Sequence, residues 1–214
     1  MHLNIKYLLT AALLVGVFCS PSYAEDLLLE DYSGRGIFQM ATWANSFEDP
    51  EGNQNSAKVE GKVAVVDWAT KWSGLPSNGP AEDVSRYKTF QVDVMVEKGQ
   101  PNEEGSHFYF QLLNETDAGY SYWELFVPQS KVPADGKWYR VRFPMSEMVT
   151  GFGDGGDAPT NFDSIIGTTC GMTFDEENKF KLKRARFDNV FLTIEKVDGI
   201  EVKPSPDTVN PIEK

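Results

Sequence analysis

Tyrosine and amide side chains alternate with apolar residues in Ser106–Leu113 (SHFYFQLL). Adjacent side chains of an extended chain point to opposite faces, so Tyr109 and Gln111 share one face and the apolar residues share the other. The apolar face is expected to pack in a core. The second face pairs an aromatic ring with a group that donates and accepts hydrogen bonds, which is the combination that a sugar ring requires.

The same alternation recurs in Tyr120–Val127 (YSYWELFV), where Tyr120, Tyr122 and Glu124 share a face. A solvent-exposed strand face more commonly carries Lys, Thr and Ser. We therefore predict a carbohydrate-binding cleft on these two strands, with Trp72, which precedes a turn, at its rim. The predicted ligand-binding residues are Tyr109, Gln111, Tyr120, Tyr122, Glu124 and Trp72. The alternative is that the tyrosines fill a second layer of core or cover a sheet face, and the pattern leaves both interpretations open.

Residues for catalysis are few. His107 is the only histidine after residue 24, and no nucleophile motif lies near it. A glycosidase needs two carboxylates facing one cleft. Glu124 faces the predicted cleft and Asp93 could face it too, so hydrolysis stays an alternative. The glycine-rich Gly151–Gly156 (GFGDGG) lacks the lysine of a phosphate-binding loop. A binding domain without catalysis is the expectation.

Charge and cysteine content exclude several other classes. The chain has 32 acidic and 20 basic residues and a net charge of −12, which disfavours binding to nucleic acid or anionic lipid. One histidine and one cysteine follow residue 24, too few for a zinc finger or an internal disulfide. Cys170 lies in an apolar stretch and is predicted to be a buried, inert thiol.

Residues 1–24 have the features of a secretory signal peptide. Lys6 supplies a positive charge, Tyr7–Phe18 (YLLTAALLVGVF) is apolar, and Ser22 and Ala24 are small residues at the positions that a signal peptidase reads. The apolar run is short for a membrane span. We expect a secreted or periplasmic protein with no membrane span after cleavage.

The remaining chain alternates between short strand-like runs and turn-forming segments, without an internal repeat. The predicted strands are Leu27–Tyr32, Ile37–Trp43, Lys58–Thr70, Arg86–Val96, Ser106–Leu113, Tyr120–Val127, Trp138–Phe143, Ser164–Phe174 and Ala185–Glu195. Gly74–Pro80 (GLPSNGP) is predicted to be a turn, and Met145–Val149 a helical turn. The pattern predicts one all-β domain over residues 25–198, an antiparallel two-sheet β-sandwich or jelly roll, followed by a flexible polar tail at 199–214.

Three segments carry a resemblance to a known family. They are Asp83–Val96 (DVSRYKTFQVDVMV), Gly136–Ser146 (GKWYRVRFPMS) and Phe187–Leu192 (FDNVFL). In this order they resemble jelly-roll carbohydrate-binding modules of the family-11-like type and the related complex-I intermediate-associated-protein type domain, over roughly residues 27–196. The resemblance implies a galactose-binding-like β-sandwich that binds a polysaccharide or oligosaccharide. A protein-interaction or assembly factor is the main alternative that it implies, and a small lyase or hydrolase is a third.

The resemblance also implies a structural calcium ion that ties the first strand to the last. The residues that match are Glu30, Asp31 and Asp188, whose carboxylate oxygens suit Ca²⁺. The alternative is an exposed acidic pair and an Asp188 that makes only turn hydrogen bonds. Asp154 and Asp157 form a second candidate site in a glycine-rich loop.

Overall fold

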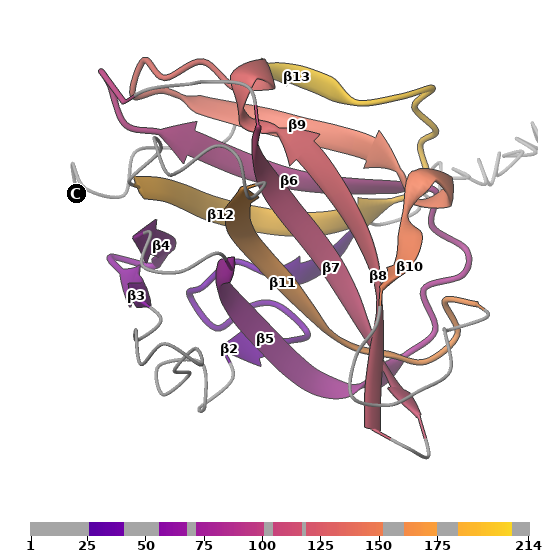
Figure 1. Ribbon diagram of the computed structural model, residues 1–214. Helices are drawn as coiled ribbons and strands as arrows, with labels where there is room; N and C mark the ends of the chain where they lie inside the picture. The colour runs from indigo at the N-terminus through magenta and orange to yellow at the C-terminus, as the bar shows by residue number, and fades with distance from the viewer. Residues whose placement is uncertain are drawn as a thin grey trace, which may run out of the picture.

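A computed structural model describes residues 26–40, 56–67, 72–100, 105–116, 119–151, 161–174 and 184–206. These residues form two antiparallel sheets packed face to face (Figure 1). The predicted all-β jelly-roll sandwich is confirmed. The predicted signal peptide and the candidate site at Asp154 and Asp157 lie outside the described residues. Among the described residues, no helix has the length and apolar character that crossing a membrane requires.

One sheet has seven strands and the other six. The seven-stranded sheet runs in the order β13 (Glu201–Pro204), β9 (Trp138–Pro144), β6 (Thr89–Val96), β12 (Arg184–Thr193), β4 (Val63–Asp67) and β3 (Ser56–Glu60), and β1 (Leu27–Glu30) also pairs with β12. The six-stranded sheet runs in the order β10 (Val149–Gly151), β8 (Gly119–Pro128), β7 (Ser106–Thr116), β11 (Ile165–Phe174), β5 (Trp72–Glu82) and β2 (Gln39–Met40). Two 3₁₀ turns, η2 (Gln129–Lys131) and η3 (Met145–Glu147), follow β8 and β9.

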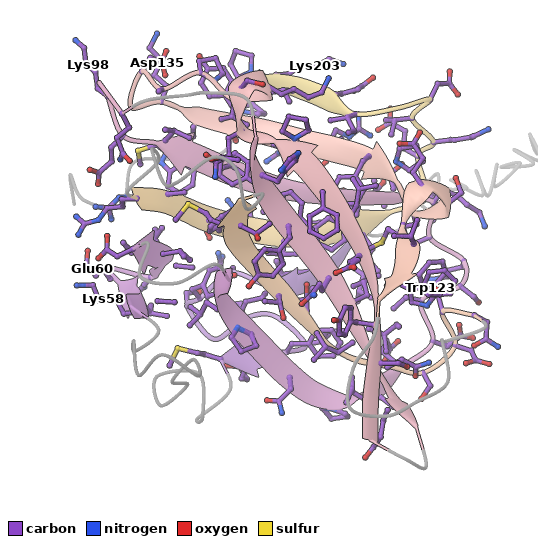
Figure 2. All side chains as sticks on the ribbon, viewed as in Figure 1. Lys58, Glu60, Lys98, Trp123, Asp135 and Lys203 are labelled. Carbon is purple, nitrogen blue, oxygen red and sulfur yellow. The ribbon has the colours of Figure 1, made fainter. Side chains whose placement is uncertain are left out.

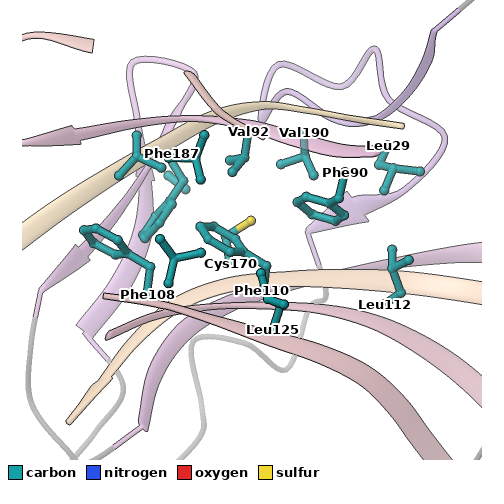
Figure 3. Close-up of a cluster of buried hydrophobic side chains, with 14 of the residues drawn as sticks. Leu29, Phe90, Val92, Phe108, Phe110, Leu112, Leu125, Cys170, Phe187 and Val190 are labelled. Atoms are coloured by element: carbon teal, nitrogen blue, oxygen red, sulfur yellow. The ribbon is translucent and has the colours of Figure 1, made fainter. Parts of the chain in front are cut away.

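The core lies between the sheets and is built from the apolar members of each alternating strand (Figure 3). The ring of Phe90 on β6 stacks on Phe143 of β9 with centroids 4.9 Å apart. Phe110 of β7 meets Phe187 of β12 edge-on, with centroids 6.2 Å apart. Cys170 is buried in this core as a free thiol, as predicted, and burial raises its pKa to about 12. Because both sheets turn their apolar face inward, the tyrosine-bearing face of β7 and β8 must lie on the outside of the sandwich.

Three predictions about the elements are wrong. Lys58–Thr70 is not one strand, because β3 and β4 form a hairpin whose turn residues Gly61 and Lys62 both have positive φ. Gly74–Pro80 is not a turn but part of β5. Proline is tolerated there because, within the part of the chain that the structure describes, β2 pairs with β5 only at Ser77 and Asn78 and leaves Pro76 without a partner residue on that side.

The predicted tail at 199–214 is the third error, since its first residues belong to the fold. Glu201–Pro204 forms β13, which pairs with β9 and places Val202 opposite Val141. Val202 packs against the core. Charged residues with a single inward apolar side chain suit an edge strand, and that composition made this segment look like a tail. The helical turn predicted at Met145–Val149 is confirmed by η3.

Candidate ligand-binding face of the six-stranded sheet

Strand register decides which predicted residues lie together. Gln111 of β7 is directly opposite Glu124 of β8, and Tyr122 is opposite Leu113. Directly opposite residues of an antiparallel pair share a face, so these side chains lie on the side of the sheet away from the core. We call this side of the six-stranded sheet the outer face. The register also puts the backbone positions of Tyr120, opposite Glu115, and Trp72, opposite Thr173, on the outer face.

Gln111 and Glu124 form a polar pair on this face. The Nε2 amide of Gln111 donates to Oε2 of Glu124 at 3.2 Å. Both side chains are half-buried. Burial raises the pKa of the Glu124 carboxyl, and the hydrogen bond from Gln111 acts in the opposite direction. A half-buried amide and carboxylate in contact can orient the hydroxyl groups of a ligand.

Tyr122 lies beside this pair, with its ring packed on the neighbouring edge strand. A Cβ atom built on Gly151 of β10 would be 2.0 Å from Cε2 of Tyr122 and 2.9 Å from Oε1 of Glu124. The Tyr122 side chain is half-buried. Its orientation follows from its neighbour Trp123, which points to the core side, where its ring centroid is 4.6 Å from that of Phe162.

Tyr109 differs from Tyr122, because it is only 6% exposed. Its hydroxyl group is 2.1 Å from the position of a Cβ atom on Gly74, so the side chain reaches across β11 to β5. Burial raises the pKa of Tyr109 well above its usual range. Tyr109 therefore forms the floor of the outer face and does not offer an open ring surface. The structure thus brings Gln111, Glu124 and Tyr122 together, and a cleft around them stays a prediction.

Two aromatic positions on the outer face were not predicted as site residues. Phe126 is opposite Tyr109 on β8, and its ring meets that of His107 edge-on with centroids 6.4 Å apart. Both side chains are half-buried. The alternation that revealed Tyr122 and Glu124 also places Phe126 on their face, so the signal was present. Phe126 was left out of the predicted site because, on these two strands, only tyrosine, amide and carboxylate side chains were selected as ligand-binding residues.

The outer face carries no positive charge from its strands. None of the six strands that the structure describes in this sheet contains a lysine or an arginine. The basic residues of the strands belong to the other sheet, and Figure 2 shows Lys58 and Lys203 on its edge strands β3 and β13. An anionic ligand would find no counter-charge on these strands of the outer face.

Asp93 does not supply a second carboxylate beside Glu124. It lies on β6 of the seven-stranded sheet, is fully buried, and accepts a hydrogen bond from Nε of Arg140 at 3.0 Å. The side-chain amide of Asn189 also donates to Asp93, at 3.0 Å. The possibility that Asp93 faces the same site as Glu124 is therefore wrong, because the two strands belong to different sheets.

The predicted calcium residues lie where β1 meets β12, with Glu30 paired to Val190. Asp31 is engaged by its own loop, since both its oxygens accept hydrogen bonds from Ser33 and Arg35. Glu30 is 1% exposed, and its Oε1 atom accepts hydrogen bonds from the backbone N–H groups of Asp31 at 3.0 Å and Tyr32 at 2.7 Å. Burial raises the pKa of Asp188 to about 7, and the nearby charges of Asp93 and Asp31 add to this shift.

Among the described residues, no three acidic, histidine or cysteine side chains converge as a metal site. Glu30, Asp31 and Asp188 therefore do not form such a cluster, and backbone carbonyl groups would have to complete any coordination by them. Calcium binding stays a prediction.

Comparison with solved structures identifies the fold. The family 11 carbohydrate-binding module of the cellulosomal cellulase Lic26A-Cel5E of Clostridium thermocellum superposes with a TM-score of 0.55 at 15% identity, covering 81% of this chain and 96% of that module. The fold is similar to that of family 11 carbohydrate-binding modules. A family 11 module from the same organism in complex with a β-1,3-1,4-mixed-linked tetrasaccharide gives a TM-score of 0.49 at 16% identity, covering 80% of this chain and 96% of that one. No protein-family model and no curated protein matches the sequence.

In this β-sandwich the polar residues of the outer face differ from those of the other sheet. The charged side chains on the outside of the other sheet are matched in pairs, such as Arg186 with Glu97 at 3.1 Å and Arg142 with Glu195 at 2.5 Å. The pair on the six-stranded sheet is instead a neutral amide with a carboxylate, next to an aromatic ring.

Proposed function

We propose that this protein is an exported, non-catalytic carbohydrate-binding protein whose site is the outer face around Tyr122, Gln111 and Glu124. The observation that carries the proposal is the half-buried Gln111–Glu124 pair beside the ring of Tyr122. The similarity to a family 11 carbohydrate-binding module supports it. Export rests on the signal-peptide features of residues 1–24.

The three side chains have complementary roles toward a sugar. The ring of Tyr122 offers an apolar surface to the C–H groups of a pyranose. Glu124 accepts hydrogen bonds from hydroxyl groups, and Gln111 both holds Glu124 and provides its own carbonyl oxygen. Affinity is expected to be weak to moderate, because sugar hydroxyl groups exchange water for protein partners at little net gain. Strands without lysine or arginine favour a neutral glycan over an acidic one.

The spacing of carboxylates supports binding without hydrolysis. On the described parts of β7 and β8, the outward carboxylates are Glu115 and Glu124. Glu115 is opposite Tyr120, four residues along the strand from Glu124, which corresponds to roughly 14 Å. Glycosidases need their two carboxylates about 5 to 9.5 Å apart.

Isothermal titration of the protein against soluble polysaccharides tests the proposal. The panel is a β-1,3-1,4-mixed-linked glucan, a xyloglucan, a galactomannan and, as the acidic member, polygalacturonate. We expect at least one neutral polysaccharide to bind and polygalacturonate not to bind. Tyr122→Ala should weaken that binding up to about tenfold, because stacking on a ring contributes up to about 1.5 kcal/mol. Tyr122→Phe, which keeps the ring, should retain most of it.

Lys203→Ala, on the far sheet, is the control for these variants and should bind as the parent does. Unchanged affinity of Tyr122→Ala would place the site elsewhere. A parent that binds none of the polysaccharides but captures a polypeptide from the native periplasm would favour the assembly-factor alternative instead.

A further inference from the structure

We propose that Gly151 is a positioning residue of this site, because its lack of a side chain is what lets the Tyr122 ring and the Glu124 carboxylate take their places on the outer face. This inference rests on the proposed function. It assigns a role to the edge strand β10, which contributes no ligand-binding side chain of its own to the predicted site.

Register brings Gly151 directly against the site. In the β10–β8 pair, Gly151 is opposite Tyr122 and Val149 is opposite Glu124. A side chain at position 151 would therefore stand on the outer face next to the Tyr122 side chain. The Tyr122 ring occupies that space instead, since a Cβ atom there would be 2.0 Å from Cε2 and 2.5 Å from Cδ2.

The carboxylate of Glu124 uses the same space. Its Oε1 atom is 2.9 Å from the Cβ position on Gly151, while its Oε2 atom accepts the hydrogen bond from Gln111. One missing side chain thus accommodates both the aromatic and the acidic member of the site, and Gln111 orients the carboxylate from the other side.

Backbone conformation does not explain glycine at this position. The described glycines with positive φ are Gly34, Gly61, Gly99, Gly105 and Gly136, and Gly151 is not among them. Any L-amino acid could adopt the backbone of Gly151 without strain. The requirement for glycine therefore comes from its contact with Tyr122 and Glu124.

An alanine at 151 would have to displace the ring. Moving Cε2 from 2.0 Å to an ordinary contact distance means a shift of at least about 1.4 Å. The ring is anchored at its own Cα on β8, so it would tilt away from the sheet and push against Glu124. Displacements of about 1 Å are enough to disable a preorganised site. We expect Gly151→Ala to lower the affinity about tenfold.

The chain provides a matched control in Gly199, which also lacks a positive φ and has nothing within 4 Å of its Cβ position. The experiment compares the parent, Gly151→Ala, Gly199→Ala, Tyr122→Leu and the double variant Gly151→Ala/Tyr122→Leu. Each is titrated with the four polysaccharides named above, and the one that binds the parent most tightly is used for the comparison. In parallel, NMR of the parent and of Tyr122→Leu reports the Hα chemical shifts of Gly151, which a ring packed on that glycine moves upfield.

The expected result has three parts. Gly151→Ala binds about tenfold more weakly than the parent, and Gly199→Ala binds within twofold of it. In the Tyr122→Leu background, adding Gly151→Ala weakens binding clearly less than in the parent, because the ring is gone and only the contact of the new methyl group with Oε1 of Glu124 remains. The upfield shift of the Gly151 Hα protons is present in the parent and lost in Tyr122→Leu.

Equal affinity of Gly151→Ala and the parent overturns the inference, as does a loss of the same size in both backgrounds. If Gly151→Ala does not fold, the NMR comparison decides, and Gly151 Hα protons that do not respond to Tyr122→Leu overturn it. If the parent binds none of the four polysaccharides, the proposed function fails and this role fails with it. If the parent binds a polysaccharide and Gly151→Ala binds it equally well, the proposed function stands and only this inference fails.

Discussion

The amide of Gln111 and the carboxylate of Glu124 meet across the β7–β8 pair, with Nε2 and Oε2 3.2 Å apart. This contact joins residues thirteen positions apart and fixes which oxygen of Glu124 is engaged. The second oxygen, Oε1, lies toward β10. A ligand hydroxyl group would therefore meet a carboxylate that is already oriented, which reduces the entropy lost on binding.

Binding should weaken as the pH falls, and Glu124 is the group responsible. Burial raises the pKa of Glu124, so it takes up a proton at a higher pH than an ordinary carboxyl group. The protonated form loses part of its capacity to accept hydrogen bonds. Titrations at a series of pH values should show affinity falling toward acid in the parent. Glu124→Gln should bind about tenfold more weakly at neutral pH and show a flatter profile. Glu201→Gln on β13 is the control, and an identical pH profile in parent and Glu124→Gln would contradict this assignment.

Asp188 should make the protein more stable in mild acid than above neutral pH. Its pKa is about 7 in the folded protein and about 3.9 when unfolded. Between these values the folded state holds the proton that the unfolded state has lost. The contribution of Asp188 to the free energy of unfolding is therefore fully present below about pH 4. It is lost as the pH rises to about 7, and it stays lost above that pH. With chelator present, unfolding in denaturant at pH 5 and pH 8 should differ by on the order of 2 kcal/mol. In Asp188→Asn the difference should shrink, and an unchanged pH dependence would show that Asp188 is not its source.

Calcium, if it binds at the β1–β12 junction, should raise the melting temperature. The ion would use the carboxylates of Glu30, Asp31 and Asp188. A ligand that binds only the folded state stabilises it by about 2.7 kcal/mol at one hundred times its dissociation constant. Thermal melting with calcium and with chelator measures the effect. Asp188→Asn should abolish it. Equal midpoints for the parent under both conditions would remove the calcium prediction.

The edge strand β13 should contribute to stability through Val202. This side chain packs against the core, whereas its neighbour Lys203 is exposed and pairs with Glu201. Val202→Ala should lower the free energy of unfolding by about 1 kcal/mol. Lys203→Ala should change it by less than about 0.5 kcal/mol. Denaturant unfolding of the two variants tests this, and equal effects would mean that residues 201–204 act as a tail after all.

The amino-acid sequence alone determined how each central strand divides into two faces. A period of two residues puts Phe110 and Leu112 in the core and Gln111 outside, whatever the rest of the chain does, because successive side chains of a strand alternate. The same reasoning put Tyr122 and Glu124 on one face. The order of three weak motifs was enough to indicate the jelly-roll fold.

Only the tertiary structure decided which strands lie next to one another, and this settled where the side chains of the two tyrosines lie. Tyr109 is buried because its side chain extends toward Gly74 on β5, two strands away, and Tyr122 is placed by Gly151 on β10. Neither glycine is near its tyrosine in sequence, so no local pattern could reveal these contacts. Edge pairing likewise turned the polar segment 201–204 into a strand, since the backbone groups of β9 supply hydrogen-bond partners that its own sequence does not reveal.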